Sequence, residues 1–193
     1  MSGHVSDTAL ESTRRRLSAK QADTVDRLGK AALDLLCREG FSALTVRRVA
    51  AQAGVGAATA YTYFSSKEHL VAEVFWRRLV ESPLAEHESP DPATRVLEVL
   101  EQISSLVAGE PEFAGAVTNA LLGKDPDVDV LRGRIGADIR ARLVVALGAA
   151  VDPDVIEALE LLYTGTLVWA GMGYEAYPEI SLRLLKSARL ILR

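Results

Sequence analysis

An all-α fold is what this 193-residue sequence predicts, and three observations support it. Apolar residues make up 49% of the chain, enough for a substantial core, whereas aromatic residues, which strands favour, make up only 6%. Apolar side chains recur three and four residues apart, which is the spacing of one helix face. Four prolines stand where helices are expected to begin, because the missing N–H costs little there: Pro111, Pro126, Pro153 and Pro178.

The first helix is expected over residues 21–39, after a basic arm over residues 1–20 that is expected to lack regular structure. Gly40 is a natural stop for this helix. The single cysteine of the chain, Cys37, cannot form an internal disulfide and is expected to be a buried structural thiol. The core-facing stripe of the helix consists of Val25, Leu28, Ala32, Leu35 and Leu36, and the arm carries Arg14, Arg15 and Arg16.

Three shorter helices are expected next. Thr45 can cap the first of them with its hydroxyl, and Gly54 can end it in a conformation with positive φ. Either Ser65 or Ser66 can cap the last of the three. The expected bounds of these helices are 46–53, 57–64 and about 67–80.

A break is expected between residues 82 and 92, where serines and prolines cluster. Beyond it the pattern predicts five more helices, over residues 93–108, 112–122, 126–149, 153–175 and 179–192. The alternating acidic residues Asp125, Asp127 and Asp129 resemble the start of a calcium loop. The glycine and the final glutamate of such a loop are missing, so these residues are interpreted as an acidic helix start.

Charge is distributed unevenly along the chain. Residues 1–80 contain 12 Lys and Arg against 8 Asp and Glu, whereas residues 81–193 contain 10 against 18. The net charge of −4 therefore hides a basic first part and an acidic second part. Such an asymmetry indicates a nucleic-acid surface near the N-terminus on a body that DNA repels.

The segment from Thr45 to Leu70 has the pattern of a helix-turn-helix, two short helices joined by a tight turn that contains glycine. Such a unit can present its second helix to the major groove of DNA. The segment resembles the DNA-binding domain of the TetR family of transcriptional regulators. The resemblance covers residues 21–70 and rests on Thr45-x-x-x-Val49-Ala50, on Ala53-Gly54-Val55, and on Thr59-x-Tyr61-x-Tyr63-Phe64-x-x-Lys67-Glu68-x-Leu70.

The resemblance implies roles for eight residues at the DNA. Arg47 is expected to reach a base edge or a phosphate, while Ala57 and Ala58, at positions that often read bases, can offer only apolar contact. At position 60 the family usually has an aliphatic residue larger than Ala60, so the packing beneath this helix is expected to differ. Phosphate contacts are implied for Thr45, Thr59, Tyr61, Tyr63 and Lys67.

The resemblance also divides the chain into a flexible basic arm over residues 1–20, a DNA-binding domain over residues 21–67, and a helical ligand-binding and dimerisation domain over residues 68–193. The last two helices are expected to pair with those of a second copy, through Leu162, Gly165, Thr166, Leu184, Leu185, Ala188 and Ile191. A pocket for an apolar or amphipathic molecule is expected to include Phe113, Val117, Asn119, Leu121, Leu143, Tyr163, Leu167, Trp169 and Met172.

The sequence therefore predicts a DNA-binding transcriptional regulator, a homodimeric repressor that binds a palindromic operator and is released by a small ligand. Two alternatives stay open: an activator or architectural regulator without a ligand, and a helical enzyme or binding module with a vestigial helix-turn-helix. The sequence contains neither a nucleophile elbow, a Walker motif nor zinc-ligand spacing, so no enzymatic activity and no cofactor are expected. Its N-terminus lacks the apolar segment of a signal peptide, and a cytoplasmic protein is expected.

Overall fold

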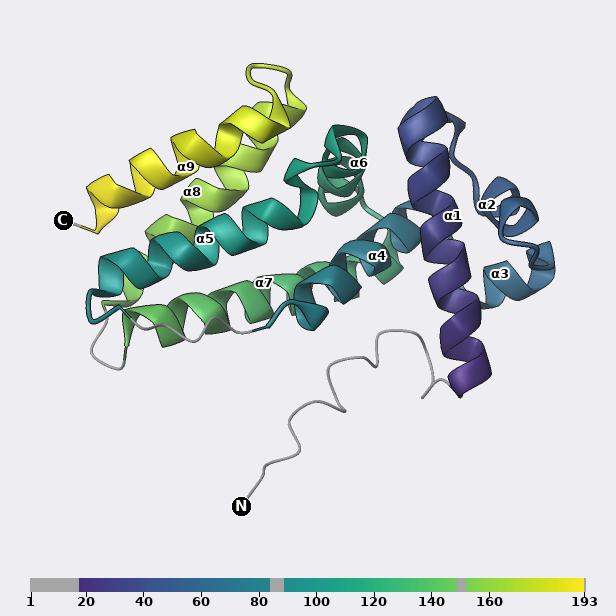
Figure 1. Cartoon of the computed structure of the whole chain (residues 1–193), viewed down its shortest axis with the longest axis horizontal. Helices are drawn as coiled ribbons and strands as arrows, with labels where there is room; N and C mark the ends of the chain where they lie inside the picture. The colour runs from purple at the N-terminus through teal and green to yellow at the C-terminus, as the bar shows by residue number, and fades with distance from the viewer. Residues whose placement is uncertain (1–17, 84–88, 149–151, 193) are drawn as a thin grey trace.

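The structure is a computed structural model that describes residues 18–83, 89–148 and 152–192. Within these ranges the chain forms nine α-helices and no strand (Figure 1), so the predicted all-α fold is confirmed. Residues 1–17 of the predicted basic arm, including Arg14, Arg15 and Arg16, lie outside the described residues, and residues 19–20 belong to the first helix. The helices are α1 (Ala19–Ala43), α2 (Val46–Gln52), α3 (Ala57–Tyr63), α4 (Lys67–Glu81), α5 (Pro92–Ala108), α6 (Pro111–Leu122), α7 (Pro126–Leu147), α8 (Pro153–Gly171) and α9 (Tyr177–Ile191).

The helices form a small unit at one end of an elongated molecule and a larger bundle at the other (Figure 1). Helices α2 and α3 pack against each other beside α1, whereas α8 and α9 lie side by side at the opposite end. Helix α4 connects the two, because it packs on α1, on α6 and on α7. The predicted domain boundary after residue 67 thus falls at the start of the helix that contacts both parts.

Helix α1 begins two residues earlier than predicted. The Ser18 side chain accepts a hydrogen bond from the backbone N–H of Gln21, and the Gln21 side chain accepts one from the N–H of Ser18, which together form a capping box. Gly40 has a φ of 74° and interrupts the helix, as its sequence position predicts. The prediction for Cys37 is wrong: it is exposed, because it lies beyond the edge of the buried stripe that ends at Leu36.

The helix-turn-helix closes around a compact core in which Val49, Ala60 and Phe64 are almost fully buried. Two caps fix its helix starts. The Thr45 hydroxyl accepts from the backbone N–H of Arg48 at 3.2 Å, and the Ser66 hydroxyl accepts from that of His69 at 2.9 Å. Thr45 and Ser66 are therefore confirmed as caps.

Arginine side chains hold several helix ends in the larger bundle. Arg142 on α7 is buried and donates to the carbonyl of Leu79, near the end of α4, at 2.7 Å. Arg95 on α5 donates to the carbonyl of Ala146, near the end of α7, also at 2.7 Å. A guanidinium at the carbonyl end of a helix satisfies acceptors that have no partner within the helix and opposes the negative end of its dipole.

Proline and aspartate start the later helices. Asp91, Asp125 and Asp152 each cap a helix whose first residue is proline, so the interpretation of residues 125–129 as an acidic helix start is confirmed. The predicted end of α8 is wrong, because the helix stops at Gly171 instead of residue 175. Gly173 there has a φ of 80°, which a helix cannot contain. None of the described helices combines the length and the apolar character needed to cross a membrane.

Gly54 has a φ of 64°, which favours glycine over any residue with a Cβ atom. We expect Gly54→Ala to lower the free energy of unfolding by about 1–2 kcal/mol, measured by urea denaturation at a fixed protein concentration. The matched control is Gly133→Ala in α7, where a methyl group meets no atom within 4 Å. That variant should gain roughly 0.5–1 kcal/mol through helix propensity. Equal effects of the two substitutions would contradict the assignment of strain to Gly54.

Candidate functional site

Helix α3 presents a polar face to solvent. Ala60 is completely buried and holds the helix against the core, so the residues around it point outward. Ala58, Thr59 and Tyr61, three of the predicted DNA contacts, are exposed, and Ala57 is half-buried. Thr62 is also exposed, although its hydroxyl donates to the carbonyl of Ala58 within the helix. Sequence reasoning missed Thr62, which the α-helical phase set by Ala60 could have revealed.

Tyr63 and Lys67 are half-buried at the end of this face. The Tyr63 ring lies 6.5 Å from that of Phe64, centroid to centroid, and packs against the core. The ammonium of Lys67 donates to the carbonyl of Phe41 at 3.0 Å and stands 4.2 Å from the centre of its ring. Lys67 therefore joins α4 to the turn after Gly40, and an ammonium retains further donors for a phosphate.

The two arginines of α2 differ in their surroundings. Arg48 donates to both carboxylate oxygens of Glu39, at 2.7 and 2.6 Å, and to the carbonyl of Ala43. Arg47 is exposed, and no hydrogen bond or ion pair joins it to any residue that the structure describes. The guanidinium of Arg47 is thus available to a partner outside the chain, on the same unit as the polar face of α3.

The start of α4 is tied to the start of α7. The Ser65 hydroxyl, directly after α3, donates to a carboxylate oxygen of Asp127 at 2.6 Å. The neighbouring Asp125 balances opposing influences on its pKa. Partial burial alone would raise that pKa, but hydrogen bonds from the Ser66 side chain and from the first N–H groups of α7 outweigh it and lower the pKa. The loop that ends the helix-turn-helix is therefore held by the larger bundle.

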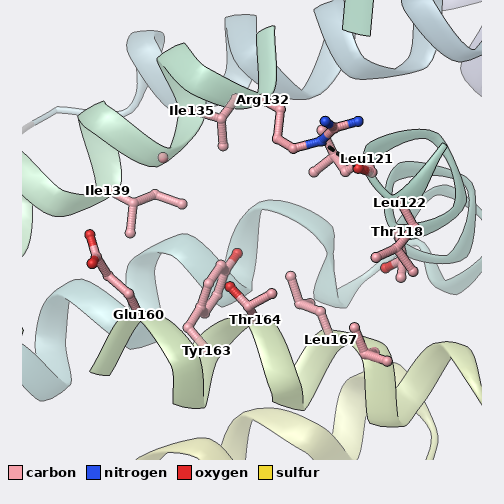
Figure 2. A pocket seen from close by; sticks show the side chains of 12 residues that line it. Thr118, Leu121, Leu122, Arg132, Ile135, Ile139, Glu160, Tyr163, Thr164 and Leu167 are labelled. Carbon is pink, nitrogen blue, oxygen red and sulfur yellow. Dashed lines mark hydrogen bonds between the residues drawn. The ribbon is translucent and has the colours of Figure 1, made fainter. Parts of the chain in front are cut away.

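A cavity of about 280 Å³ opens between α6, α7 and α8 (Figure 2). Three of the nine predicted pocket residues, Leu121, Tyr163 and Leu167, line it. The other lining residues were missed by sequence reasoning, because periodicity does not tell which helix faces meet across a gap. They are Thr118, Leu122, Arg132, Ile135, Gly136, Ile139, Glu160, Thr164 and Val168.

The remaining predicted pocket residues lie elsewhere. Three are core side chains outside the cavity, because they face neighbouring helices: Phe113, Val117 and Leu143. Three are exposed: Asn119, Trp169 and Met172. These six residues therefore do not line this cavity.

The charged side chains at this cavity have partners within the chain. Arg132 donates to the carbonyls of Leu121 and Gly123, at 2.6 and 2.7 Å, and to the carboxylate of Asp129. Arg132 thereby caps the C-terminal end of α6 by satisfying its carbonyl groups. Glu160 accepts from the guanidinium of Arg140 at 2.6 Å.

The outer surface of α8 and α9 is partly apolar. Leu161 and Leu182 are 66% and 76% exposed, and Trp169 stacks on Tyr174 with ring centres 4.5 Å apart. Among the predicted dimer residues, Gly165 is exposed on this surface, whereas the side chains of Leu162, Leu185 and Ile191 are half-buried. Three others are buried within the chain itself, because α9 packs against both α5 and α8: Thr166, Leu184 and Ala188.

The described residues contain no cluster of three or more His, Cys, Asp or Glu side chains that could hold a metal ion. The geometry is that of a helix-turn-helix DNA-binding protein: a short, exposed helix anchored by a tight turn, with hydroxyl groups and a free guanidinium beside it.

The comparisons with known proteins agree with this class. The model of bacterial regulatory proteins of the tetR family matches residues 28–74. An uncharacterized HTH-type transcriptional regulator of Mycobacterium tuberculosis is 43% identical over 175 residues, which cover 90% of this chain and 82% of that protein. The transcriptional repressor KstR of Rhodococcus jostii is 30% identical over 110 residues, covering 56% of this chain and 52% of KstR. The chain belongs to the TetR family and is an HTH-type transcriptional regulator.

Solved structures share the fold along most of the chain. A TetR transcriptional regulator from Rhodococcus sp. RHA1 superposes with a TM-score of 0.71 at 22% identity, covering 91% of this chain and 98% of that one. FadR from Bacillus subtilis, solved in complex with stearoyl-CoA, superposes with a TM-score of 0.59 at 18% identity, covering 86% and 97%. At these identities the likeness concerns the fold.

The lowered pKa of Asp125 generates a prediction about acid stability. Its carboxylate adds stability that is present above its unfolded-state pKa and lost as the pH falls through the lower folded-state value. Asp125→Asn keeps a capping side chain without the charge. We expect wild type to exceed this variant by roughly 0.3–1 kcal/mol at neutral pH, with the difference shrinking between about pH 5 and about pH 3. Urea denaturation at several pH values measures it.

The matched comparison is Asp125→Ala, which also removes the cap and should be about 1 kcal/mol less stable than Asp125→Asn. A difference between wild type and Asp125→Asn that stays constant across the pH range would contradict the charge as its cause.

Proposed function

We propose that this regulator is a cytoplasmic repressor that binds a palindromic operator as a homodimer and leaves it when a small apolar or amphipathic molecule binds. The observation that carries the proposal is the exposed face of α3, where hydroxyl-bearing side chains surround the anchoring Ala60. Hydroxyl groups and cations hold phosphate oxygens and so fix the register of a helix on DNA.

The proposed DNA contacts include many to phosphate oxygens and few to the edges of bases. Thr45, Thr59, Tyr61, Tyr63 and Lys67 are assigned to phosphates. Arg47 is assigned to a base edge or a phosphate, and Ala57 and Ala58 to apolar contact in the groove. Because Ala57 and Ala58 cannot form hydrogen bonds to base edges, sequence specificity depends on Arg47, on the basic N-terminal arm and on the shape of the DNA.

A dimer is part of the proposal because one short helix contacts few base pairs, whereas two half-sites about 34 Å apart supply useful specificity. The exposed apolar side chains on α8 and α9 support this end of the molecule as the contact, opposite to α3 (Figure 1). We assign the interface to Leu161, Gly165, Trp169, Leu182 and Leu190, which are exposed, with Leu162, Leu185 and Ile191 at its margin.

The ligand is assigned to the cavity between α6, α7 and α8. Helix α7 supports a coupling between this cavity and the DNA, because it lines the cavity through Ile135 and Ile139 and holds Ser65 through Asp127. A ligand that shifts α7 would change the position of α4 and hence the spacing of the two α3 helices. Ligand and operator affinities would then be reciprocally linked. FadR of Bacillus subtilis, solved with stearoyl-CoA, supports an amphipathic ligand in this fold.

The test is selection of bound DNA from random sequence, which should yield a palindrome. On that DNA, Arg47→Ala should weaken binding by roughly tenfold or more at moderate salt, measured by fluorescence anisotropy. The control is Arg38→Ala, which removes the same charge from a residue bound to Asp34 and Gln52. Equal losses in the two variants would mean that only net charge matters, and failure to select a palindrome would contradict dimeric operator binding.

The dimer interface has a separate test. Leu182→Glu should raise the dimer dissociation constant by roughly tenfold or more, because a leucine that the partner covers is replaced by a charge. Sedimentation velocity over a range of concentrations measures this. Val130→Glu on α7, another exposed apolar position, should leave the association unchanged. A wild-type protein that remains monomeric, or equal effects of both substitutions, would refute the interface.

A further inference from the structure

The hydroxyl of Tyr163 is a polar group for which the described residues offer no hydrogen-bond partner. The Tyr163 side chain extends from α8 into the cavity, between Ile139 and Leu167 (Figure 2). The residue is only 7% exposed, yet no hydrogen bond joins the hydroxyl to any residue in the part of the chain that the structure describes. Its oxygen is not among the buried atoms that lack a partner, so the hydroxyl is reachable from the cavity, and a molecule bound there can accept a hydrogen bond from it.

The protonation state of Tyr163 defines what the partner must be. Burial raises the pKa of the phenol well above its usual value, so the hydroxyl stays neutral throughout the physiological range. A neutral phenol readily donates a hydrogen bond to an oxygen acceptor. Two other hydroxyl-bearing residues line the cavity: Thr164 is exposed, and the buried Thr118 already donates to the carbonyl of Ala114 and accepts from Tyr177.

The charged groups around the cavity argue against an anionic partner. Arg132 is engaged by two backbone carbonyls of the α6 end and by Asp129, so its charge is already compensated. Glu160, which is paired with Arg140, brings a carboxylate to the wall of the cavity. A carboxylate or phosphate that entered would lose its hydration without gaining an unpaired cation from the residues that the structure describes.

The size and the walls of the cavity limit the rest of the molecule. Its volume is about 280 Å³, and the walls are mainly aliphatic side chains from three helices. Since a water molecule occupies about 30 Å³ of liquid, the space suits a compact molecule of on the order of ten non-hydrogen atoms. Apart from one oxygen that meets Tyr163, such a molecule should be apolar.

The geometry points to a specific ligand class: a compact, uncharged, largely apolar molecule whose carbonyl oxygen accepts a hydrogen bond from the hydroxyl of Tyr163. This assignment deepens the proposed function, on which its regulatory meaning rests, by naming the chemistry that the cavity selects. Tyr163 is the specificity-determining residue, and the aliphatic walls supply the remaining affinity.

The experiment uses three probes with equal numbers of non-hydrogen atoms: acetophenone, isopropylbenzene and benzoate. Their binding to the full chain is measured by titration calorimetry or by ligand-observed NMR. Wild type should prefer acetophenone, and Tyr163→Phe should weaken acetophenone binding roughly three- to tenfold while leaving isopropylbenzene unchanged. Benzoate should bind roughly tenfold or more weakly than acetophenone to the wild type.

The matched control is Tyr177→Phe, which removes a hydroxyl that the chain already binds, 3.0 Å from the Thr118 oxygen. It should leave the preference for acetophenone intact. The inference is overturned if Tyr163→Phe binds acetophenone as tightly as wild type, if benzoate binds at least as tightly, or if none of the probes binds.

Failure of the proposed function is separable from these outcomes. If acetophenone binds through Tyr163 but leaves operator affinity unchanged, the ligand-release mechanism is wrong and the assignment of the site stands. Conversely, operator release by a compound whose affinity does not depend on Tyr163 would keep the regulator and overturn this ligand class. Without ligand, Tyr163→Phe should unfold at a temperature no lower than that of wild type, because the lost hydroxyl has no hydrogen-bond partner among the described residues.

Discussion

The burial of α4 between two groups of helices is the constraint on which the rest of this structure depends. One helix packs on α1 of the DNA-binding unit and on α6 and α7 of the larger bundle. Its beginning is held through Ser65 and Asp127, and its end through Arg142 and the carbonyl of Leu79. Close-packed interiors deform little, so a displacement of α7 has to move α4 as well. The fold thereby joins the cavity between α6, α7 and α8 to the helix-turn-helix through packed helices.

Several arginine side chains join one helix to the end of another. Arg78, Arg95, Arg132 and Arg142 each donate to a backbone carbonyl near the end of a neighbouring helix. Carbonyl groups at helix ends and nearby carboxylates thus compensate these charges. The cavity therefore stays mainly apolar, although Arg132 forms part of its wall. Arg47 behaves differently, because it stays exposed beside α3. The contrast separates cations that build the fold from one that is offered to a partner.

The DNA-binding unit depends on small side chains at decisive points. Gly54 permits the turn, and Ala60 lets α3 approach the core closely enough to bury it completely. The larger aliphatic residue that the family usually has at position 60 would hold the helix by bulk, whereas here close backbone approach does so. In the proposed complex, Ala57 and Ala58 face the bases with small side chains, so contacts to the DNA backbone would outnumber contacts to base edges.

The sequence by itself determined the local features: the helix-turn-helix, the cap at Thr45, a serine cap at position 65 or 66, and the proline-marked starts of the later helices. These follow from interactions between residues close in the chain, which leave a readable pattern. Tertiary structure decided which faces of the long apolar helices are covered. Leu184 and Ala188 proved internal, Cys37 proved exposed, and Ile135 and Ile139 came to line a cavity. A helix that is apolar nearly all round carries no phase that says which neighbour covers which side, so only packing could settle it.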